Sequence, residues 1–123
     1  GDVYKRQAKA YLNQRADKKA MNDLQTLAKD TRTLYGAEAK YLVAQQLYKA
    51  GEYTAAEKEI LNFIDQSTPH AYWLARSFVL LSDVYVAMDK KLDARQYLLS
   101  LQQNYHADDD IEQMINERLE KLK

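Results

Sequence analysis

Apolar residues recur along this chain with the spacing of a helix face. Three times an alanine is followed by an apolar residue four and seven positions later, and residues so spaced share one side of a helix. We therefore expect each triplet to be the buried stripe of a helix, with its alanine where a neighbouring helix comes close. The triplets are Ala20, Leu24 and Leu27; Ala56, Ile60 and Phe63; and Ala94, Leu98 and Leu101.

The spacing between triplets predicts a repeat. The three alanines are separated by 36 and 38 positions, a period typical of stacked supersecondary units. The chain is therefore expected to be all-α, with little sequence left for long loops. The expected helices cover about 8–14, 17–30, 37–49, a segment from 54 onward, 69–88, 91–104 and a final stretch from about 111.

Local signals mark several helix ends. Gly51 follows one expected helix, where a left-handed residue is wanted, and Asp89 takes the same place one repeat later. The signals for helix starts are two capping boxes and one pair of cap residue and proline. These lie at Thr54–Glu57, Asp110–Gln113 and Thr68–Pro69.

The last expected helix differs from the others because only one of its faces is apolar. A stack of repeats must end with such a helix, so we expect 109–123 to be a C-terminal capping helix. Asp108–Asp110 places negative charge at the positive end of the helix dipole, which favours a helix start over a calcium site. The apolar face comprises Ile111, Met114, Ile115, Leu119 and Leu122.

Composition narrows the class of function. The chain has 123 residues, with 18 Lys plus Arg and 18 Asp plus Glu, so no net field favours nucleic acid or an anionic membrane. The absence of cysteine excludes disulfides, thiolate catalysis and cysteine-type zinc sites. The most apolar stretch, 72–88, is interrupted by polar residues and falls short of a membrane span, so a buried helix is expected there.

The sequence offers little for catalysis. His70 and His106 lie 36 positions apart and could stack at one edge, but no third metal ligand accompanies them. No Ser-His-Asp arrangement, phosphate loop or nucleotide fingerprint is present. We therefore expect a protein that is not an enzyme and needs no metal or cofactor.

The first seven residues are expected not to belong to the native protein. Residues 1–7 resemble the translation of a transposon-end adaptor used in preparing sequencing libraries. They are therefore expected to be a non-native leader. The native protein is then expected to continue upstream of Ala8, which would make this chain part of a longer protein.

Aligned on its alanines, the chain resembles the tetratricopeptide repeat family, whose unit of about 34 residues is a pair of antiparallel helices. The match covers 37–70, with Ala44 and Ala56 at the small positions, although Lys40 departs from the usual tryptophan-type residue. The resemblance implies a right-handed α-solenoid. Its expected parts are a partial repeat over 8–36, a unit over 37–70, a unit with an extended first helix over 71–108, and the cap over 109–123.

The resemblance also implies a binding surface, because the first helices of successive units in this family line a concave groove. Tyrosine and arginine are favoured at interfaces, although the tyrosines could equally complete packing between units. The lysine–asparagine clamp of chaperone-binding relatives is absent, because Tyr41, Gln45 and Leu80 occupy its places. The candidate contacts are Tyr41, Gln45, Tyr48, Lys49, Arg76, Val79, Asp83 and Val86, with Glu38 and Ala87 also on that face.

Three functions remain open at this point. The first is a non-catalytic protein–protein interaction scaffold that binds an internal, partly apolar peptide or a protein surface in the groove. The second is a structural cap, or a segment that self-associates through the truncated N-terminal end of a longer array. The third is a regulatory accessory domain of an enzyme lying upstream. Residues 68–78 are similar to the C-terminal end of large repeat proteins of Gram-negative cell envelopes, which implies a periplasmic or outer-membrane-associated location.

Overall fold

The computed structural model describes residues 2–123, and the side chains of 2–8 and 16–123 within them. Over this part of the chain the fold is all-α, as the periodicity predicts, and contains no strand. The helices are α1 (Asp2–Leu27), α2 (Leu34–Lys49), α3 (Tyr53–Asp65), α4 (Ala71–Ala87), α5 (Lys91–Asn104) and α6 (Ile111–Lys121).

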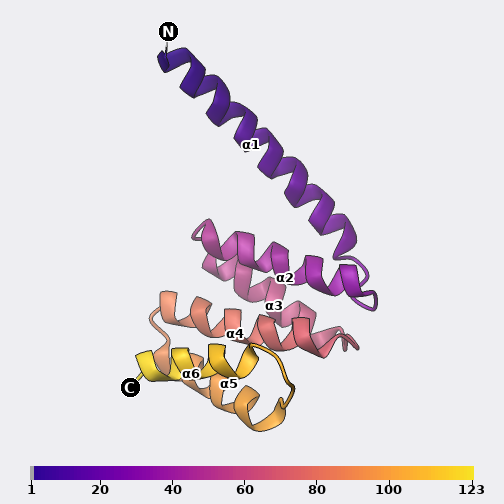
Figure 1. The fold of residues 1–123 in the computed structure, drawn as a ribbon, viewed down its shortest axis with the longest axis vertical. Helices are drawn as coiled ribbons and strands as arrows, with labels where there is room; N and C mark the ends of the chain where they lie inside the picture. The colour runs from indigo at the N-terminus through magenta and orange to yellow at the C-terminus, as the bar shows by residue number, and fades with distance from the viewer. Residues whose placement is uncertain (1) are drawn as a thin grey trace.

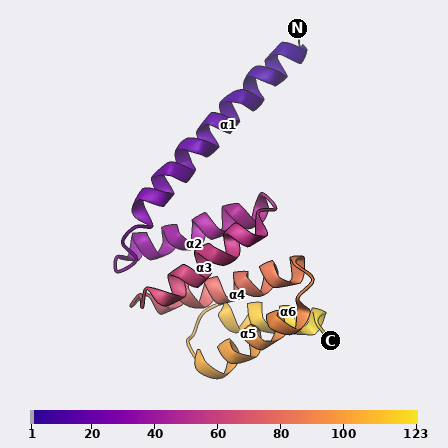
Figure 2. The ribbon, with the colours of Figure 1, turned by 180° about the vertical axis from the view of Figure 1, so that it is seen from behind.

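Helix α4 is the centre of the stack, because it contacts α2, α3, α5 and α6. This explains why its sequence is apolar on more than one face, and eight of its residues are buried. Helices α2 and α3 pack against each other on one side of α4, and α5 and α6 close the other side. Seen from behind, α6 again lies at the end of the stack opposite α1 (Figure 2).

Helix α1 projects from this stack, so that the N-terminus lies far from the C-terminus (Figure 1). Among the described helices it contacts α2 alone, and its C-terminal end packs through Met21, Leu24 and Ala28 against Ala39 and Val43. The predicted break before Asp17 is wrong, because α1 is continuous. No glycine or proline interrupts residues 2–27, so no strong helix breaker separates the two helices that were predicted.

The alanine pattern holds for two triplets and fails for the first. Ala56 and Ala94 are completely buried, and both belong to the main core cluster, which also contains Leu81 and Tyr85. Ala20, however, is exposed, and Leu27 is 51% exposed. The predicted stripe fails there because α1 has a single neighbouring helix, and Ala28 makes the close contact instead.

Several predicted caps are also wrong. Helix α3 begins at Tyr53 after Glu52, so Thr54 lies inside the helix and makes no capping bond. The ring of Tyr53 packs 5.7 Å from that of Tyr48, which carries the chain directly from the Gly51 turn into the helix. Gly51 and Asp89 do adopt the predicted left-handed backbone, with φ of 79° and 60°.

Helices α4 and α6 begin without the caps that the sequence predicts. Helix α4 begins at Ala71 and not at Pro69. The Thr68 hydroxyl accepts from the His70 amide at 3.2 Å, just before the helix, and donates to the Thr31 carbonyl at 2.7 Å. Asp109, not Asp110, accepts from the Ile111 amide at 2.9 Å. The bond from Thr68 to Thr31 joins residues 37 positions apart, and local sequence does not predict it.

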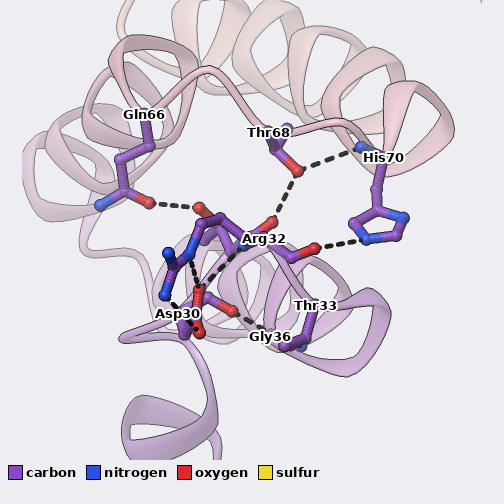
Figure 3. A network of polar contacts seen from close by, with 8 residues as sticks. Asp30, Arg32, Thr33, Gly36, Gln66, Thr68 and His70 are labelled. Atoms are coloured by element: carbon purple, nitrogen blue, oxygen red, sulfur yellow. Dashed lines mark hydrogen bonds and ion pairs between the residues drawn. The ribbon is translucent and has the colours of Figure 1, made fainter.

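A network of polar contacts joins the loop before α2 to the loop before α4 (Figure 3). The Thr31 hydroxyl donates to Gln66 Oε1 at 2.8 Å, and the His70 ring nitrogen Nε2 lies 2.9 Å from the Arg32 carbonyl oxygen. Asp30 accepts from Arg32 within the first loop, which lowers the pKa of the Asp30 carboxyl. The network ties together points that lie one repeat apart in the sequence.

Lys40, the departure from the family pattern, has a structural role. Its side chain is almost entirely buried, and its Nζ lies 2.8 Å from Glu59 Oε1 on α3. A buried ammonium must have such a partner to be tolerated. Lys40 therefore joins α2 to α3 through an ion pair.

Candidate functional site

Two adjoining cavities lie between α2, α4 and α6, and we call them together the groove. The first, the Arg76 cavity, has a volume of about 190 Å³, and the second, the Val86 cavity, about 580 Å³. Both are bounded by Tyr48, Asp83 and Arg118. Each cavity is thus lined by residues of α2, α4 and α6, and the Val86 cavity also by Lys91 and Leu98 of α5. Helices α2 and α4 carry the predicted contacts.

The structure brings the candidate contacts together. Seven of the eight line the Arg76 cavity, and the eighth, Val86, lines the Val86 cavity together with Ala87. Glu38 lines neither cavity. The seven are Tyr41, Gln45, Tyr48, Lys49, Arg76, Val79 and Asp83.

These residues are not equally open to a partner. Tyr41 is 5% exposed and Val79 is 2% exposed, so both form the wall of the cavity. The Tyr41 ring packs 5.6 Å from the Trp73 ring, and its hydroxyl accepts from Gln45 Nε2 at 3.2 Å. For Tyr41 the structure therefore supports packing between units, whereas Tyr48, Lys49 and Val86 are accessible.

Arg76 is held in place by aromatic neighbours. Its guanidinium carbon lies 5.1 Å from the Tyr41 ring centroid and 5.8 Å from that of Trp73, within the range of cation–π attraction. Its Nη1 donates to the Tyr72 hydroxyl at 3.2 Å, which in turn donates to Asp110 Oδ1 at 2.8 Å. Burial and the bond to Asp110 raise the pKa of Tyr72.

An ion pair crosses the groove between α4 and α6. Arg118 donates from Nε to Asp83 Oδ1 at 2.8 Å and from Nη2 to Asp83 Oδ2 at 3.0 Å, a bidentate arrangement. Arg118 also donates to the Met114 carbonyl at 3.2 Å. The pair stands where the two cavities meet and fixes α6 against α4. Burial and the Asp83 charge raise the pKa of Tyr48 beside it.

Sequence reasoning missed the contribution of α6 to the groove. Met114 was expected only on the apolar face of a capping helix, yet Met114 and Arg118 line the Arg76 cavity. A signal was present, because Asp83 and Arg118 are opposite charges 35 positions apart, close to the repeat period. For Lys91 and Lys121, which line the Val86 cavity, no sequence signal was present.

The two histidines do not meet. His70 Nε2 contacts the Arg32 carbonyl, while His106 Nε2 lies 3.0 Å from the Gln103 carbonyl in the loop before α6. In the described part of the chain, no three His, Cys, Asp or Glu side chains are grouped closely enough to hold a metal ion.

Comparisons of the chain with protein-family models, curated proteins and solved structures give no match. Among the described helices, none has both the length and the apolarity needed to cross a membrane. Inference about function therefore starts from the groove.

Proposed function

We propose that this chain is a non-catalytic protein-interaction module, built as a tetratricopeptide-like stack, whose groove binds a peptide segment of a partner protein. The observation that carries the proposal is that the predicted partner contacts lie together in the structure. Residues singled out by the resemblance as partner contacts line two adjoining cavities between α2, α4 and α6. A groove of this kind suits a chain segment better than a flat protein surface.

The groove is suited to binding because its walls are fixed before a partner arrives. Tyr41, Val79 and Leu80 are buried in the core, and the bidentate Asp83–Arg118 pair joins α4 to α6. Walls held in this way lose little conformational entropy when a ligand docks. The mechanism is therefore complementarity of a preformed surface.

The titratable groups of the groove favour binding over catalysis. Asp83 is engaged on both carboxylate oxygens by Arg118. The Tyr48 hydroxyl is protonated at neutral pH like that of any tyrosine, and burial raises its pKa further. A general base must be free to accept a proton near neutral pH, and neither side chain meets that requirement.

A second candidate function, assembly with further repeats or with a second copy, rests on the junction of α1 and α2. Leu27 and Leu34 are each 51% exposed there, and Tyr35 is 71% exposed. Exposed apolar side chains at one place are typical of an association surface. Sedimentation analysis of wild type and a Leu27→Ser/Tyr35→Ser variant tests it. A wild-type chain that stays monomeric at high concentration argues against self-association.

The groove proposal is tested by selection from a displayed library of random peptides. Ala87→Trp places a large side chain in the Val86 cavity from an exposed position on α4. Ala55→Trp makes the same change at an exposed position on α3, which lies outside the groove. Peptides selected on wild type are expected to bind Ala55→Trp equally and to lose binding to Ala87→Trp.

Two results would overturn the proposal. One is a selection that enriches no peptide on the wild-type chain. The other is a set of enriched peptides whose binding is the same for Ala87→Trp and Ala55→Trp, because their site would then lie elsewhere. Equal thermal midpoints of the two variants ensure that lost binding reflects the groove and not the fold.

A further inference from the structure

The groove differs in charge from the rest of the molecule. Five cationic side chains line its two cavities, namely Lys49, Arg76, Lys91, Arg118 and Lys121, against the carboxylates of Asp83 and Glu117. The whole chain has 18 of each sign. Positive charge is therefore concentrated in the groove, and an excess of negative charge is left on the remaining surface.

Most of these cations lack a carboxylate partner within the chain. Of the five, Arg118 alone takes part in an ion pair of the described structure, leaving four without one. Lys49, Lys91 and Lys121 are exposed, whereas Arg76 is half-buried against Tyr41 and Trp73. A partly buried cation without a counter-ion is costly, so a carboxylate supplied by a partner would be stabilised at Arg76.

From this arrangement, and resting on the proposed function, we propose that the groove selects an acidic peptide. One carboxylate of the peptide occupies the Arg76 cavity, where Arg76 and Lys49 face it. An apolar side chain of the peptide enters the larger Val86 cavity. Further carboxylates lie near Lys91 and Lys121 at its rim.

The apolar part of the proposal comes from the lining of the Val86 cavity. Val86 is 40% exposed, one of few large apolar residues so open outside α1 and its junction with α2. Leu98, which is buried, and the half-buried Leu122 border the same cavity. A bulky apolar side chain placed there would remove this surface from water. The surrounding lysines would meet the flanking acidic residues.

A nucleic acid is a poorer fit to the same charges. The Asp83 carboxylate stands where the two cavities meet and would oppose a phosphate backbone that follows the groove. Single-stranded nucleic acid also requires open aromatic faces for its bases. The Tyr41 and Trp73 rings already pack against each other and against Arg76. The Tyr48 ring, which lines both cavities, packs against Tyr53.

The peptide selection described above also tests the charge, because the net charge of the groove-dependent peptides can be compared with that of the unselected library. We expect these peptides to be acidic and to contain a bulky apolar residue. The best acidic peptide is then synthesised with a fluorescent label, together with a version in which every Glu and Asp is replaced by its amide. Fluorescence anisotropy is expected to show tighter binding of the acidic form, weakening as salt is added.

Paired variants of the protein assign the effect to the groove. Lys49→Gln/Lys91→Gln removes two exposed charges that line it, and Lys58→Gln/Arg95→Gln removes two exposed charges from α3 and α5 outside it. The groove pair is expected to weaken binding of the acidic peptide about fivefold, from roughly 0.5 kcal/mol for each exposed contact. The control pair is expected to change it less than about twofold.

The outcomes separate the two proposals. Groove-dependent peptides that are neutral or basic would overturn the acidic inference and leave the groove proposal standing. So would equal binding of the acidic peptide and its amide version, or displacement of the peptide by a single-stranded oligonucleotide at lower concentration. An absence of groove-dependent peptides would overturn the proposed function itself.

Discussion

Gly36 provides the sharpest test of how the loop before α2 is packed. It is buried in the first turn of α2, where its amide donates to the Thr33 hydroxyl at 2.9 Å. A Cβ at this position would lie 1.8 Å from the Asp30 carbonyl oxygen and 2.7 Å from the Thr33 hydroxyl oxygen. Helix propensity alone predicts that Gly36→Ala stabilises α2 by about 1 kcal/mol. The short contacts of this Cβ predict instead that Gly36→Ala destabilises the fold.

The magnitude follows from what must move. Ordinary contact at 3.4 Å requires the Asp30 carbonyl to retreat by about 1.6 Å, and backbone cannot rotate aside as a side chain can. Loss of the Thr33 cap costs about 1 kcal/mol. Movement of the Asp30 carbonyl also disturbs the next two carbonyls. Thr31 accepts a hydrogen bond from Thr68, and Arg32 accepts one from His70. Breaking these bonds costs about 1 kcal/mol each. Against the gain in propensity, we expect Gly36→Ala to destabilise by about 2 kcal/mol.

Urea denaturation measures this change directly. Trp73 is the only tryptophan, and it packs on Tyr41 in the stack, so its fluorescence reports on the core and not on α1. Ala55→Gly, at an exposed site on α3, is the control for propensity and is expected to cost about 1 kcal/mol. Thr33→Ala is the control for the cap alone. A Gly36→Ala midpoint equal to or above that of wild type would refute the packing argument.

Four further predictions follow from the core, the groove, the tyrosines and α1. Ala56→Leu is expected to overpack the main core and to destabilise by about 1–3 kcal/mol in urea; an unchanged midpoint would mean that Ala56 does not face a neighbouring helix. A double-mutant cycle with Asp83→Asn and Arg118→Gln is expected to give a coupling energy of about 1 kcal/mol, because the pair is bidentate but partly solvated. If the changes in the free energy of unfolding of the two single variants simply add, the pair does not hold α6. Burial and the bond to Asp109 raise the pKa of Tyr105 from its ordinary value of 10 to about 12. The protonated Tyr105 therefore stabilises the fold fully below pH 10, and this contribution is lost as pH rises toward 12. Tyr105→Phe should flatten the alkaline fall of the unfolding midpoint, and an equally steep fall in this variant would contradict the assignment. Amides in the N-terminal half of α1 are expected to exchange faster than those of α4, since α1 contacts only α2 in the described structure; equal protection would be inconsistent with the projecting helix.

The sequence predicted those features that depend on helix period and on local backbone demands. The interval 91–104 carries a complete triplet between a left-handed residue and a polar loop, and α5 occupies that interval. Gly51 and Asp89 are left-handed as predicted, because few other residues accept that conformation. The groove residues came instead from the resemblance to the tetratricopeptide family, which implied that the first helices of successive units share one surface. The structure places these residues around two adjoining cavities.

Features that depend on contacts between units were not predictable. Thr68 has the sequence of a helix cap, but its hydroxyl is used by the Thr31 carbonyl 37 positions earlier. Ser67 adopts a φ of 53° although neither it nor its neighbours require this conformation. The first triplet was predicted to be buried because its period is correct, but period does not reveal whether a second helix is present to cover Ala20.

The polar contacts between units share a spacing that suggests a common task. Thr31 with Gln66, Arg32 with His70 and Asp83 with Arg118 are separated by 35, 38 and 35 positions. Most buried members of the apolar clusters between them are small or aliphatic residues, whose contacts have little directional preference and could form in more than one register. Hydrogen bonds and ion pairs have strict geometry, so a slipped register would leave these groups without partners. We therefore infer that the core supplies most of the stability of the stack, while the polar contacts one period apart fix how each unit sits on the next.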